Sequence, residues 1–356
     1  MPRSDSSSRL AEAAGILPGL PHGAEVLLIR FRSLGDLVLE TPAIRALHDW
    51  RPDLSIVILA EARFAAVFEH NPALSEVIFP HGLLGTSLEL RRRAFPVAFN
   101  QHGGPRSAMI TGLSGARWRV GWKGYQYSFF YNVQVPDARD FFDGAAVHTA
   151  AHRLSQLYFA GLPRGPIPKP QIFPQPDATV SVARALAAKG IGADAPYAVL
   201  QPGARLPGMR WPIAQFAKLA GWLRDKHGLA SVVNLAARDE ELAAVAATEF
   251  QGVAVIPPPL SVRELIALIA KAHIFVGNDS GPAHLASALD RPNVVIFSET
   301  DPAQWAPLNS RGRVVSTGAT FRYPRGDKSV IATQPRALDA IALEEVQQAC
   351  NAALQL

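Results

Sequence analysis

Asp36 is the residue near the start of the chain whose position suggests chemistry. It ends the loop RSLGD, after the apolar run EVLLIRF and before a helical pattern that starts at Thr41-Pro42. In chains of alternating strands and helices, ligands are held where such a strand ends. A carboxylate there, ionised at neutral pH, can act as general base toward a sugar hydroxyl. The alternative is that Asp36 only caps a helix, although Thr41 and Pro42 provide a helix start of their own.

The sequence of the same loop argues against dinucleotide binding, which is a common function of the loop after the first strand. A dinucleotide-binding domain carries Gly-x-Gly-x-x-Gly after its first strand, whereas this loop has only Gly35. The backbone is therefore not expected to approach a pyrophosphate here, and a nicotinamide-dependent dehydrogenase loses most of its support. We expect Asp36 to be presented on a flexible glycine hinge.

A second candidate site lies in the stretch HIFVGNDSGPAHLASAL, residues 273–289. A strand is expected to end in a turn, and a helix is expected to follow it. The free N–H groups and the dipole of a helix start bind anions, so a diphosphate leaving group fits. The residues of this turn are Asp279, Ser280, Gly281 and Pro282, with His284 one turn on as a donor to phosphate or ribose. The alternative is a well-capped structural helix with His284 on the surface.

Two further loops follow strand-like runs in the second half. In QPGARLPGMRWP, Gly203 offers a backbone N–H, and Arg205 and Arg210 offer charge to phosphate oxygens. In NLAARDEEL, Glu240 or Glu241 can accept hydrogen bonds from sugar hydroxyls. For these glutamates, a solvated helix start is the simpler explanation.

Composition limits the class of protein. The chain has 356 residues, 48% of them hydrophobic, a formal net charge of +5 and no apolar run long enough to span a membrane. The basic balance suits an anionic partner, but no nucleic-acid-binding motif is present, so we expect no nucleic acid. The single Cys350 excludes an internal disulfide and indicates a cytosolic protein. His148 and His152 have the spacing of a metal pair but no third ligand, so we expect no metal.

The elements that position these residues are strands of a doubly wound α/β fold. Val/Ile/Leu-rich runs such as EVLLIRF, LSIVILA and PVAFN, and later YAVLQPG, ASVVNLA, HIFVGND and NVVIF, are typical of parallel strands covered on both faces. Helical patterns at 212–226, 240–250 and 262–272 separate the later runs. We expect two Rossmann-like domains with parallel sheets facing a central cleft. The expected segments are a loose arm at 1–24, a first domain at 25–165, a proline-rich linker at 166–180, a second domain at 181–334, and a C-terminal helix at 335–356 that packs back toward the first domain.

The chain resembles glycosyltransferase family 9, the bacterial lipopolysaccharide heptosyltransferases. The resemblance rests on IRFRSLGDLVLETPAIRAL, residues 29–47, and on VGNDSGPAHLASALDRPNVVIFSETDPAQWAP, residues 276–307. It covers nearly the whole chain from Glu25 onward. The stretch NQHGGPRSAMITGLSGARWRVGW, residues 100–122, is similar to the branch that adds the third inner-core heptose.

The resemblance implies a GT-B fold and an inverting, metal-independent glycosyltransferase that uses no cofactor. Its donor would be ADP-L-glycero-D-manno-heptose and its acceptor the lipopolysaccharide core, with action in the cytoplasm and peripheral contact with the inner membrane. Asp36 falls on the family's catalytic base. The remaining matched positions are Asp279, Ser280, Gly281 and His284 in the donor turn, Gly203 and Ala204 in the phosphate loop, Leu260 near the adenine pocket, and Glu240 near the ribose or heptose.

Three departures from the family pattern concern the donor. Met209 stands where a lysine often precedes Arg-Trp-Pro, so Arg205 or Arg210 must supply the charge. Asn278 precedes Asp279, and Ser298-Glu299 replaces the usual Gly-Pro.

For the acceptor, the basic residues of the first domain can meet acidic or phosphorylated sugars, with plain surface charge as the alternative. They are Arg106, Arg117, Arg119 and Lys123. Other uses of this fold remain open, namely another nucleotide sugar, a sugar-nucleotide epimerase, or an inert binding protein.

Overall fold

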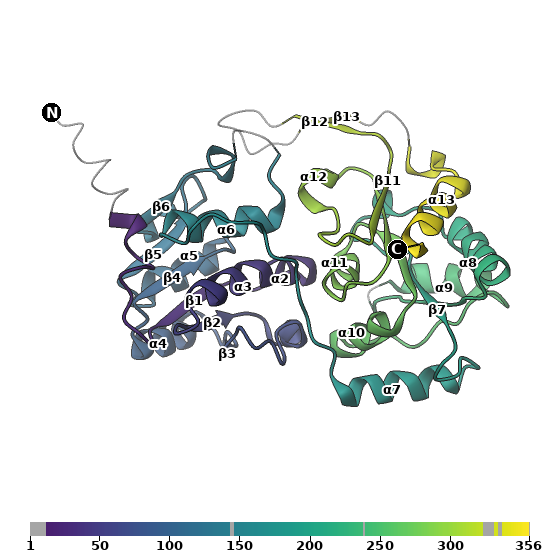
Figure 1. Cartoon of the computed structure of the whole chain (residues 1–356), viewed down its shortest axis with the longest axis horizontal. Coiled ribbons are helices and arrows are strands. Elements are labelled where there is room, and N and C mark those ends of the chain that lie inside the picture. Colours follow the sequence, from purple (N-terminus) through teal and green to yellow (C-terminus); the bar gives the residue numbers. More distant parts are fainter. Residues whose placement is uncertain (1–11, 143–145, 238, 323–330, 334–336, 356) are drawn as a thin grey trace. The chain divides into compact units, whose positions relative to one another are not determined.

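The computed structural model describes residues 12–142, 146–237, 239–322, 331–333 and 337–355. The chain divides into two compact units, Met1–Gln171 and Ile172–Leu356 (Figure 1). Each unit is a parallel β-sheet with helices on both faces.

The first unit is built on a six-stranded sheet in the order β3-β2-β1-β4-β5-β6. All neighbouring strands are parallel. The strands are β1 (Glu25–Ile29), β2 (Ser55–Leu59), β3 (Glu76–Ile78), β4 (Val97–Asn100), β5 (Trp118–Trp122) and β6 (Val133–Val135). Strands β1, β2 and β4 lie in the apolar runs named above, and each of them is buried along nearly its whole length.

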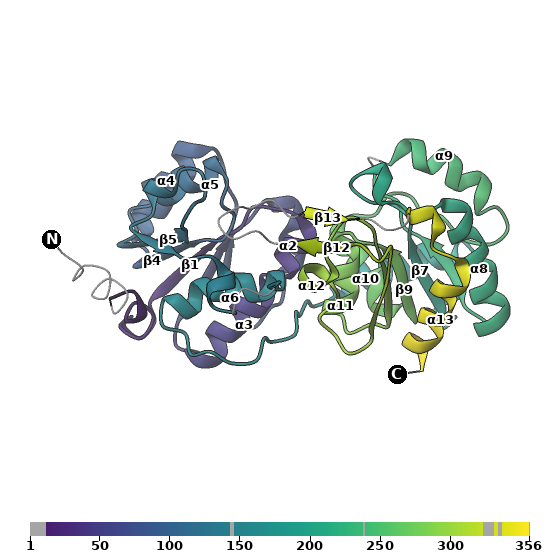
Figure 2. The same ribbon diagram turned by 90° about the horizontal axis from the view of Figure 1, so that it is seen from above.

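Helices cover both faces of this sheet (Figure 2). The helical elements are α2 (Leu34–Val38), α3 (Thr41–Trp50), η1 (Ala62–Val67), α4 (Leu83–Arg93), α5 (Pro105–Leu113), η2 (Ser128–Phe130), η3 (Ala138–Asp140) and α6 (Thr149–Phe159). Helices α4 and α5 lie side by side on one face, where Leu90 and Ile110 pack with Leu27 and Ile29 of β1. Helices α3 and α6 pair on the other face.

Residues 12–24 are not the loose arm that the sequence suggested. Ile16 and Leu17 are buried, and the Leu17 N–H donates to the Ala160 carbonyl at 2.9 Å. Arg51 donates to the carbonyls of Leu17 and Leu20, each at 3.1 Å. The apolar side chains of this segment therefore pack on the first unit. The proline and glycine residues of the segment gave no indication of this packing. Residues 1–11 of the expected arm lie outside the described residues.

The second unit repeats the design with a five-stranded sheet in the order β11-β10-β9-β7-β8. The strands are β7 (Tyr197–Gln201), β8 (Ala230–Val233), β9 (Ile274–Asn278), β10 (Asn293–Phe297) and β11 (Gly312–Ser316), with a separate pair β12 (Thr320–Arg322) and β13 (Ile331–Thr333). A parallel bridge from Val232 to Val255 extends the β8 edge. With Val255 counted as a strand, both sheets have the Rossmann strand order 3-2-1-4-5-6.

Helices again flank the sheet on both sides. They are α7 (Pro176–Ala187), η4 (Pro207–Met209), α8 (Ile213–His227), α9 (Glu240–Glu249), α10 (Val262–Lys271), α11 (Gly281–Ala288), α12 (Pro302–Trp305), η5 (Leu338–Ala340) and α13 (Leu343–Leu354). Helix α7 begins inside the segment expected to be a linker. Among the described residues, no helix combines the length and the apolarity needed to cross a membrane.

The C-terminal helix α13 completes the core of its own unit. Val346, Cys350 and Ala353 are fully buried with side chains of β9, β10 and α8. Whether this helix also packs toward the first domain stays a prediction. Its apolar face was correctly read from the sequence, but that face fills the space beside β11 and α8. Burial raises the pKa of the Cys350 thiol to about 12.

Candidate active site

The first candidate site lies at the carboxyl edge of the first sheet. Strands β1 and β4 are neighbours there, and the chain leaves them toward opposite sides of the sheet. Such a switch point is where open α/β sheets bind ligands. Arg30 follows β1, Gln101 follows β4, and Asp36 lies on the short helix that comes after β1.

Asp36 lies in helix α2 rather than on a flexible hinge. Ser33 is the N-cap residue of this helix, and one oxygen of Asp36, Oδ2, accepts from the Ser33 N–H at 3.2 Å and from the Ser33 hydroxyl at 3.0 Å. Capping is therefore part of what Asp36 does. The other oxygen, Oδ1, accepts from Arg153 Nη2 at 2.9 Å and pairs with Arg30. Two arginines are more than a cap requires.

The charge on Asp36 is strongly favoured. Burial alone would raise its pKa, but Arg30 and Arg153, with hydrogen bonds from Arg30 and Ser33, hold the pKa well below its usual range. Burial also lowers the pKa of Arg30, and the nearby Arg153 cation adds to this effect. Asp36 is thus a carboxylate at neutral pH.

The two arginines are themselves held in place. Both donate to the Gln101 carbonyl, Arg30 Nη1 at 2.6 Å and Arg153 Nη1 at 3.0 Å. Their exposed fractions are 7% and 5%. Neither residue was predicted from the sequence. Arg30 could have been noticed as a charge at the end of a buried strand, whereas nothing in the sequence near α6 connects Arg153 to Asp36.

Glu40 is a second carboxylate in this cluster, and it was also missed. It lies four residues after Asp36, is fully buried, and its Oε2 is 3.8 Å from Nε of Arg153. Burial raises its pKa to about 7 against the opposing effect of Arg153 and Arg30. It is the N-cap residue of α3, so the helix start predicted at Thr41-Pro42 is the signal that could have found it.

Several buried polar atoms near the ends of β4 and β5 lack partners within the described residues. They are both side-chain polar atoms of Gln101, Oε1 of Gln156, Nδ1 of His102, Nε1 of Trp122 and the Tyr131 hydroxyl. Buried polar atoms in folded proteins are nearly always hydrogen-bonded, so this edge has unused capacity for a polar ligand. Burial, with Arg30 and Arg32, lowers the pKa of His102 to about 4, so this ring is neutral at pH 7.

The basic residues expected to meet the acceptor are separated by the structure. Arg106 is exposed at the start of α5, with its guanidinium 5.4 Å from the centre of the Phe31 ring, and Lys123 is exposed just after β5. Arg119 lies toward the opposite end of β5. It donates to the carbonyls of Phe130 at 3.1 Å and Ala116 at 3.0 Å. Arg106 and Lys123 therefore follow carboxyl ends of strands, whereas Arg119 braces the backbone.

The second candidate site lies at the carboxyl edge of the second sheet, where β7 and β9 form its switch point. Asn278 ends β9 and is fully buried. Its Nδ2 donates to the Pro202 carbonyl at 2.8 Å, and its Oδ1 accepts from the Trp211 N–H at 3.0 Å. This departure from the family pattern thus joins the phosphate loop to the donor turn.

The donor turn has the expected form. Helix α11 begins at Gly281, with Ser280 as N-cap residue and Pro282 in its first turn. Asp279 accepts from the Thr300 hydroxyl at 2.5 Å, and burial raises the pKa of Asp279. His284 is buried, at 5% exposure, so its alternative role as a surface residue is excluded.

The phosphate loop is tightly packed around Gly203. A Cβ at this position would lie 2.7 Å from Oδ2 of Asp239, so only glycine fits without displacement. Asp239 is buried and was missed, although it directly precedes Glu240. Arg210 donates to the Ala204 carbonyl at 3.2 and 3.3 Å and lies 3.6 Å from Asp239. Among the loop's two arginines, Arg205 is the exposed one.

The remaining donor candidates lie farther along the same unit. Met209 is buried at 8% exposure, so this position contributes packing and no charge. Glu240 is exposed in the first turn of α9. Leu260 precedes α10 and lines a small hollow with side chains of α7 and α10, including Val182.

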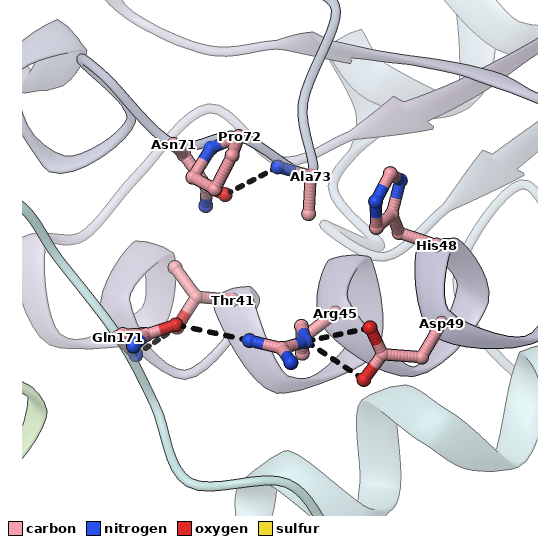
Figure 3. A pocket seen from close by; sticks show the side chains of 8 residues that line it. All are labelled: Thr41, Arg45, His48, Asp49, Asn71, Pro72, Ala73 and Gln171. Carbon is pink, nitrogen blue, oxygen red and sulfur yellow. Dashed lines mark hydrogen bonds and ion pairs between the residues drawn. The ribbon is translucent and has the colours of Figure 1, made fainter. Parts of the chain in front are cut away.

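Two other features carry no assignment. Among the described residues, no group of three or more His, Cys, Asp or Glu side chains is arranged to hold a metal. His148 instead caps α6, and the His152 ring lies 4.1 Å from that of Trp122. A hollow of about 180 Å³ borders α3 (Figure 3), but there Arg45 is already paired with Asp49 at 2.7 Å. None of the predicted site residues lines it.

Comparisons with known proteins identify the family of the chain. The family model of glycosyltransferase family 9 (heptosyltransferase) matches residues 86–330, which is more than half of the chain. The chain therefore belongs to this family, and the expectation of a glycosyltransferase is confirmed.

Among curated relatives, lipopolysaccharide heptosyltransferase 2 of Escherichia coli K12 is 26% identical over 310 residues, covering 82% of this chain and 87% of the relative. Lipopolysaccharide heptosyltransferase 3 of Escherichia coli is 24% identical over 293 residues, covering 78% and 84%. Relatives named 1, 2 and 3 are about equally similar, so the comparisons identify the family and not one branch.

The fold is that of solved members of the family. A family 9 glycosyltransferase from Veillonella parvula matches with a TM-score of 0.79 at 18% identity, covering 93% of this chain and 97% of that one. Escherichia coli ADP-heptose heptosyltransferase II matches with a TM-score of 0.74 at 24% identity, covering 93% and 98%. The α/β GT-B fold expected from the sequence is confirmed.

Proposed function

We propose that this protein transfers a heptose from ADP-L-glycero-D-manno-heptose to the inner core of lipopolysaccharide, with inversion and without a metal ion. Membership of family 9 and the names of the curated relatives support the donor and acceptor classes. The observation that carries the proposal is the anchored carboxylate of Asp36 at the switch point of the first sheet. We place the reaction in the cytoplasm, at the inner membrane face.

The two oxygens of Asp36 have different roles in this proposal. Oδ1 is held by two arginines, which fix the position of the carboxylate. Oδ2 receives a backbone N–H and the exposed Ser33 hydroxyl. Rotation of that hydroxyl frees one lone pair, which can then accept the proton of a bound sugar. We therefore assign Oδ2 as the reacting oxygen and the Ser33 hydroxyl as its occupant before the acceptor binds.

The reaction follows from this arrangement. The acceptor oxygen bonds to the anomeric carbon of the donor while the bond from that carbon to the diphosphate breaks, through an oxocarbenium-like transition state. The electron pair of the broken bond leaves with ADP, and the acceptor proton passes to Oδ2 of Asp36. Because Asp36 has a low pKa, it is a weak base. It takes the proton late, when the attacking oxygen has become acidic through bonding to the cationic carbon.

The second unit would stabilise the departing diphosphate. The start of α11, at Gly281, presents free backbone N–H groups, which together with the helix dipole favour an anion. Arg205 is exposed on the phosphate loop, while Arg210 fixes the shape of this loop through the Ala204 carbonyl. Arg205 is therefore our choice for the charge that a lysine supplies in many family members.

The test is an incubation of the full chain with ADP-heptose and a heptose-deficient lipopolysaccharide core, with and without EDTA. We expect one added heptose by mass spectrometry, released ADP in equal amount, and no effect of EDTA. ADP binding without transfer would contradict the assigned donor or acceptor sugar. A changed sugar nucleotide without an acceptor product would instead indicate an epimerase.

A further inference from the structure

One surface of the first unit combines exposed apolar side chains with exposed arginines. On α4, Leu84 is 76% exposed and Leu88 is 49% exposed, while Leu90 points into the core. Arg91 and Arg92 follow on the same side of the helix, at positions i+7 and i+8 from Leu84, and both are exposed. The outer face of α4 is thus an apolar stripe that ends in two cations.

Neighbouring elements extend this stripe. Helix α5 packs beside α4, and a Cβ added to Gly115, after α5, would lie 3.0 Å from Cγ of Arg91 (Figure 2). The Phe130 ring lies against Gly112 of α5, where an added methyl group would be 2.3 Å away. Phe129, the preceding residue in η2, is 73% exposed. We call these parts of α4, α5 and η2 together the α4–η2 surface.

The sequence that forms most of this surface contains no acid. From Leu90 to Pro136 the chain has seven arginines and lysines and neither Asp nor Glu. The one acid of α4, Glu89, faces His81 at 3.5 Å. Arg93 is paired with Glu25 and Glu76, so Arg91 and Arg92 are the cations of α4 that can meet a partner. An acidic partner is therefore favoured over a second copy of the chain, because a two-fold contact through this surface would bring arginines against arginines.

The apolar component decides the class of acidic partner. Nucleic acid is held mainly through its phosphates, and exposed leucines on a helix add little to such binding. An anionic lipid surface uses both features, since apolar side chains enter the acyl boundary while arginines stay among the head groups. We infer that the α4–η2 surface docks the protein on an anionic lipid bilayer through Leu84, Leu88 and Phe129, with Arg91 and Arg92 at the head groups.

This inference deepens the proposed placement of the reaction at the inner membrane face, on which it rests, and it stands on residues separate from those of the transfer reaction. None of the five side chains belongs to the Asp36 cluster or to the donor site. Docking through them would hold the acceptor domain at the surface where a lipid-anchored acceptor is found. The test below requires no transfer activity, so its failure and the failure of the proposed function are distinguishable.

The experiment is co-sedimentation of the full chain with vesicles of phosphatidylcholine alone or with one quarter phosphatidylglycerol. We expect binding to the anionic vesicles, little binding to the neutral ones, and release in high salt. The variant L84E/L88E should bind at least tenfold more weakly. R91S/R92S should lose roughly fivefold in affinity for each arginine removed.

The matched control is V180E/V245E, which alters two exposed valines of the second unit, 59% and 47% exposed. It should bind vesicles like the wild type, and thermal unfolding should confirm that all variants are folded. Equal binding to neutral and anionic vesicles, or unchanged binding of folded L84E/L88E, would overturn the inference. So would a wild-type dimer in solution that L84E/L88E converts to a monomer, because the surface would then join two copies.

Discussion

Arg153 and Asp36 are 117 positions apart in the chain and are joined by a hydrogen bond of 2.9 Å. This contact ties α6, the last helix of the first unit, to the short helix that follows its first strand. Together with Arg30 it leaves the carboxylate almost no freedom to turn. The energetic cost of burying three charges is offset by their mutual pairing and by the shared Gln101 carbonyl.

Removal of the Asp36 carboxylate tests the proposed base. In Asp36→Asn, kcat should fall roughly 10²–10⁴-fold, because no group remains to take the acceptor proton. The affinity for ADP, measured by calorimetry, should stay at the wild-type value. The control is Asp49→Asn, which alters an exposed aspartate of α3 that is paired with Arg45. Wild-type turnover in folded Asp36→Asn would remove Asp36 from the mechanism.

Arg153 should set the acidic limit of activity. It lowers the pKa of Asp36, so in Arg153→Met this pKa rises and the carboxylate is protonated at a higher pH. The variant should therefore lose kcat/KM in acid at a pH where the wild type is still active, which appears as an acidic limb at higher pH, and Arg153→Lys should restore part of the difference. A limb that stays in place while kcat falls at all pH values would mean that Arg153 serves folding only.

A variant of Ser33 tests the different roles proposed for the two oxygens of Asp36. If its hydroxyl only occupies the acceptor position, Ser33→Ala keeps wild-type kcat and loses about 1 kcal/mol of stability, the usual cost of a lost N-cap. Steady-state kinetics and thermal unfolding measure the two effects. A fall in kcat as large as that of Asp36→Asn would show that the hydroxyl relays the proton instead.

Because of Glu40, the free energy of unfolding of the protein should fall as pH rises. Its folded pKa of about 7 lies above its ordinary value, so between these two pH values the folded state binds more protons than the unfolded state. The contribution of Glu40 to the free energy of unfolding is thus greatest in acid. This contribution, on the order of 3 kcal/mol, is lost by pH 8. Urea unfolding at pH 5 and pH 8 should show this loss in the wild type and not in Glu40→Gln.

The control for Glu40 is Glu249→Gln, which alters an exposed glutamate of α9. It should keep the pH dependence of the wild type. The prediction fails if Glu40→Gln and Glu249→Gln unfold alike at both pH values.

The phosphate loop offers a pair of matched glycines. In Gly203→Ala the new methyl group would meet Asp239 at 2.7 Å and Gln201 at 3.0 Å, whereas nothing lies within 4 Å of a methyl group at Gly208. We expect Gly203→Ala to raise the Kd for ADP at least tenfold and Gly208→Ala to leave it unchanged. Isothermal calorimetry with ADP measures both. Equal affinities would place the diphosphate away from this loop.

Much of the fold could be predicted because its central strands are buried on both faces. After their first residues, Glu25 and Asn293, the strands β1 and β10 consist of Val, Ile, Leu and Phe without alternation, which is typical of parallel strands. Strand β5 was not recognised, because WRVGW combines an arginine and a glycine with two large aromatic residues. Strand β6 has only three residues, with a polar one at its centre.

Only those parts of the site that lie close together in the sequence could be predicted. Asp36 and the donor turn were found because each follows a strand directly. Arg153 contributes to the site through tertiary packing of α6, which no nearby residue indicates. The expected hinge at Gly35 was wrong for a local reason, since Ser33 and Asp36 satisfy each other's backbone and side-chain groups and so start a helix. Similarly, the apolar face of α13 shows that it packs but does not indicate against which unit.

The burial of Cys350 has a practical consequence. It is the single cysteine of the chain and is fully buried, with a thiol pKa near 12, so the native protein presents no reactive thiolate to a maleimide at neutral pH. A cysteine introduced in place of exposed Leu84 would therefore be the sole labelled position. A polarity-sensitive fluorophore there would report in real time whether α4 leaves water, without any other change to the sequence.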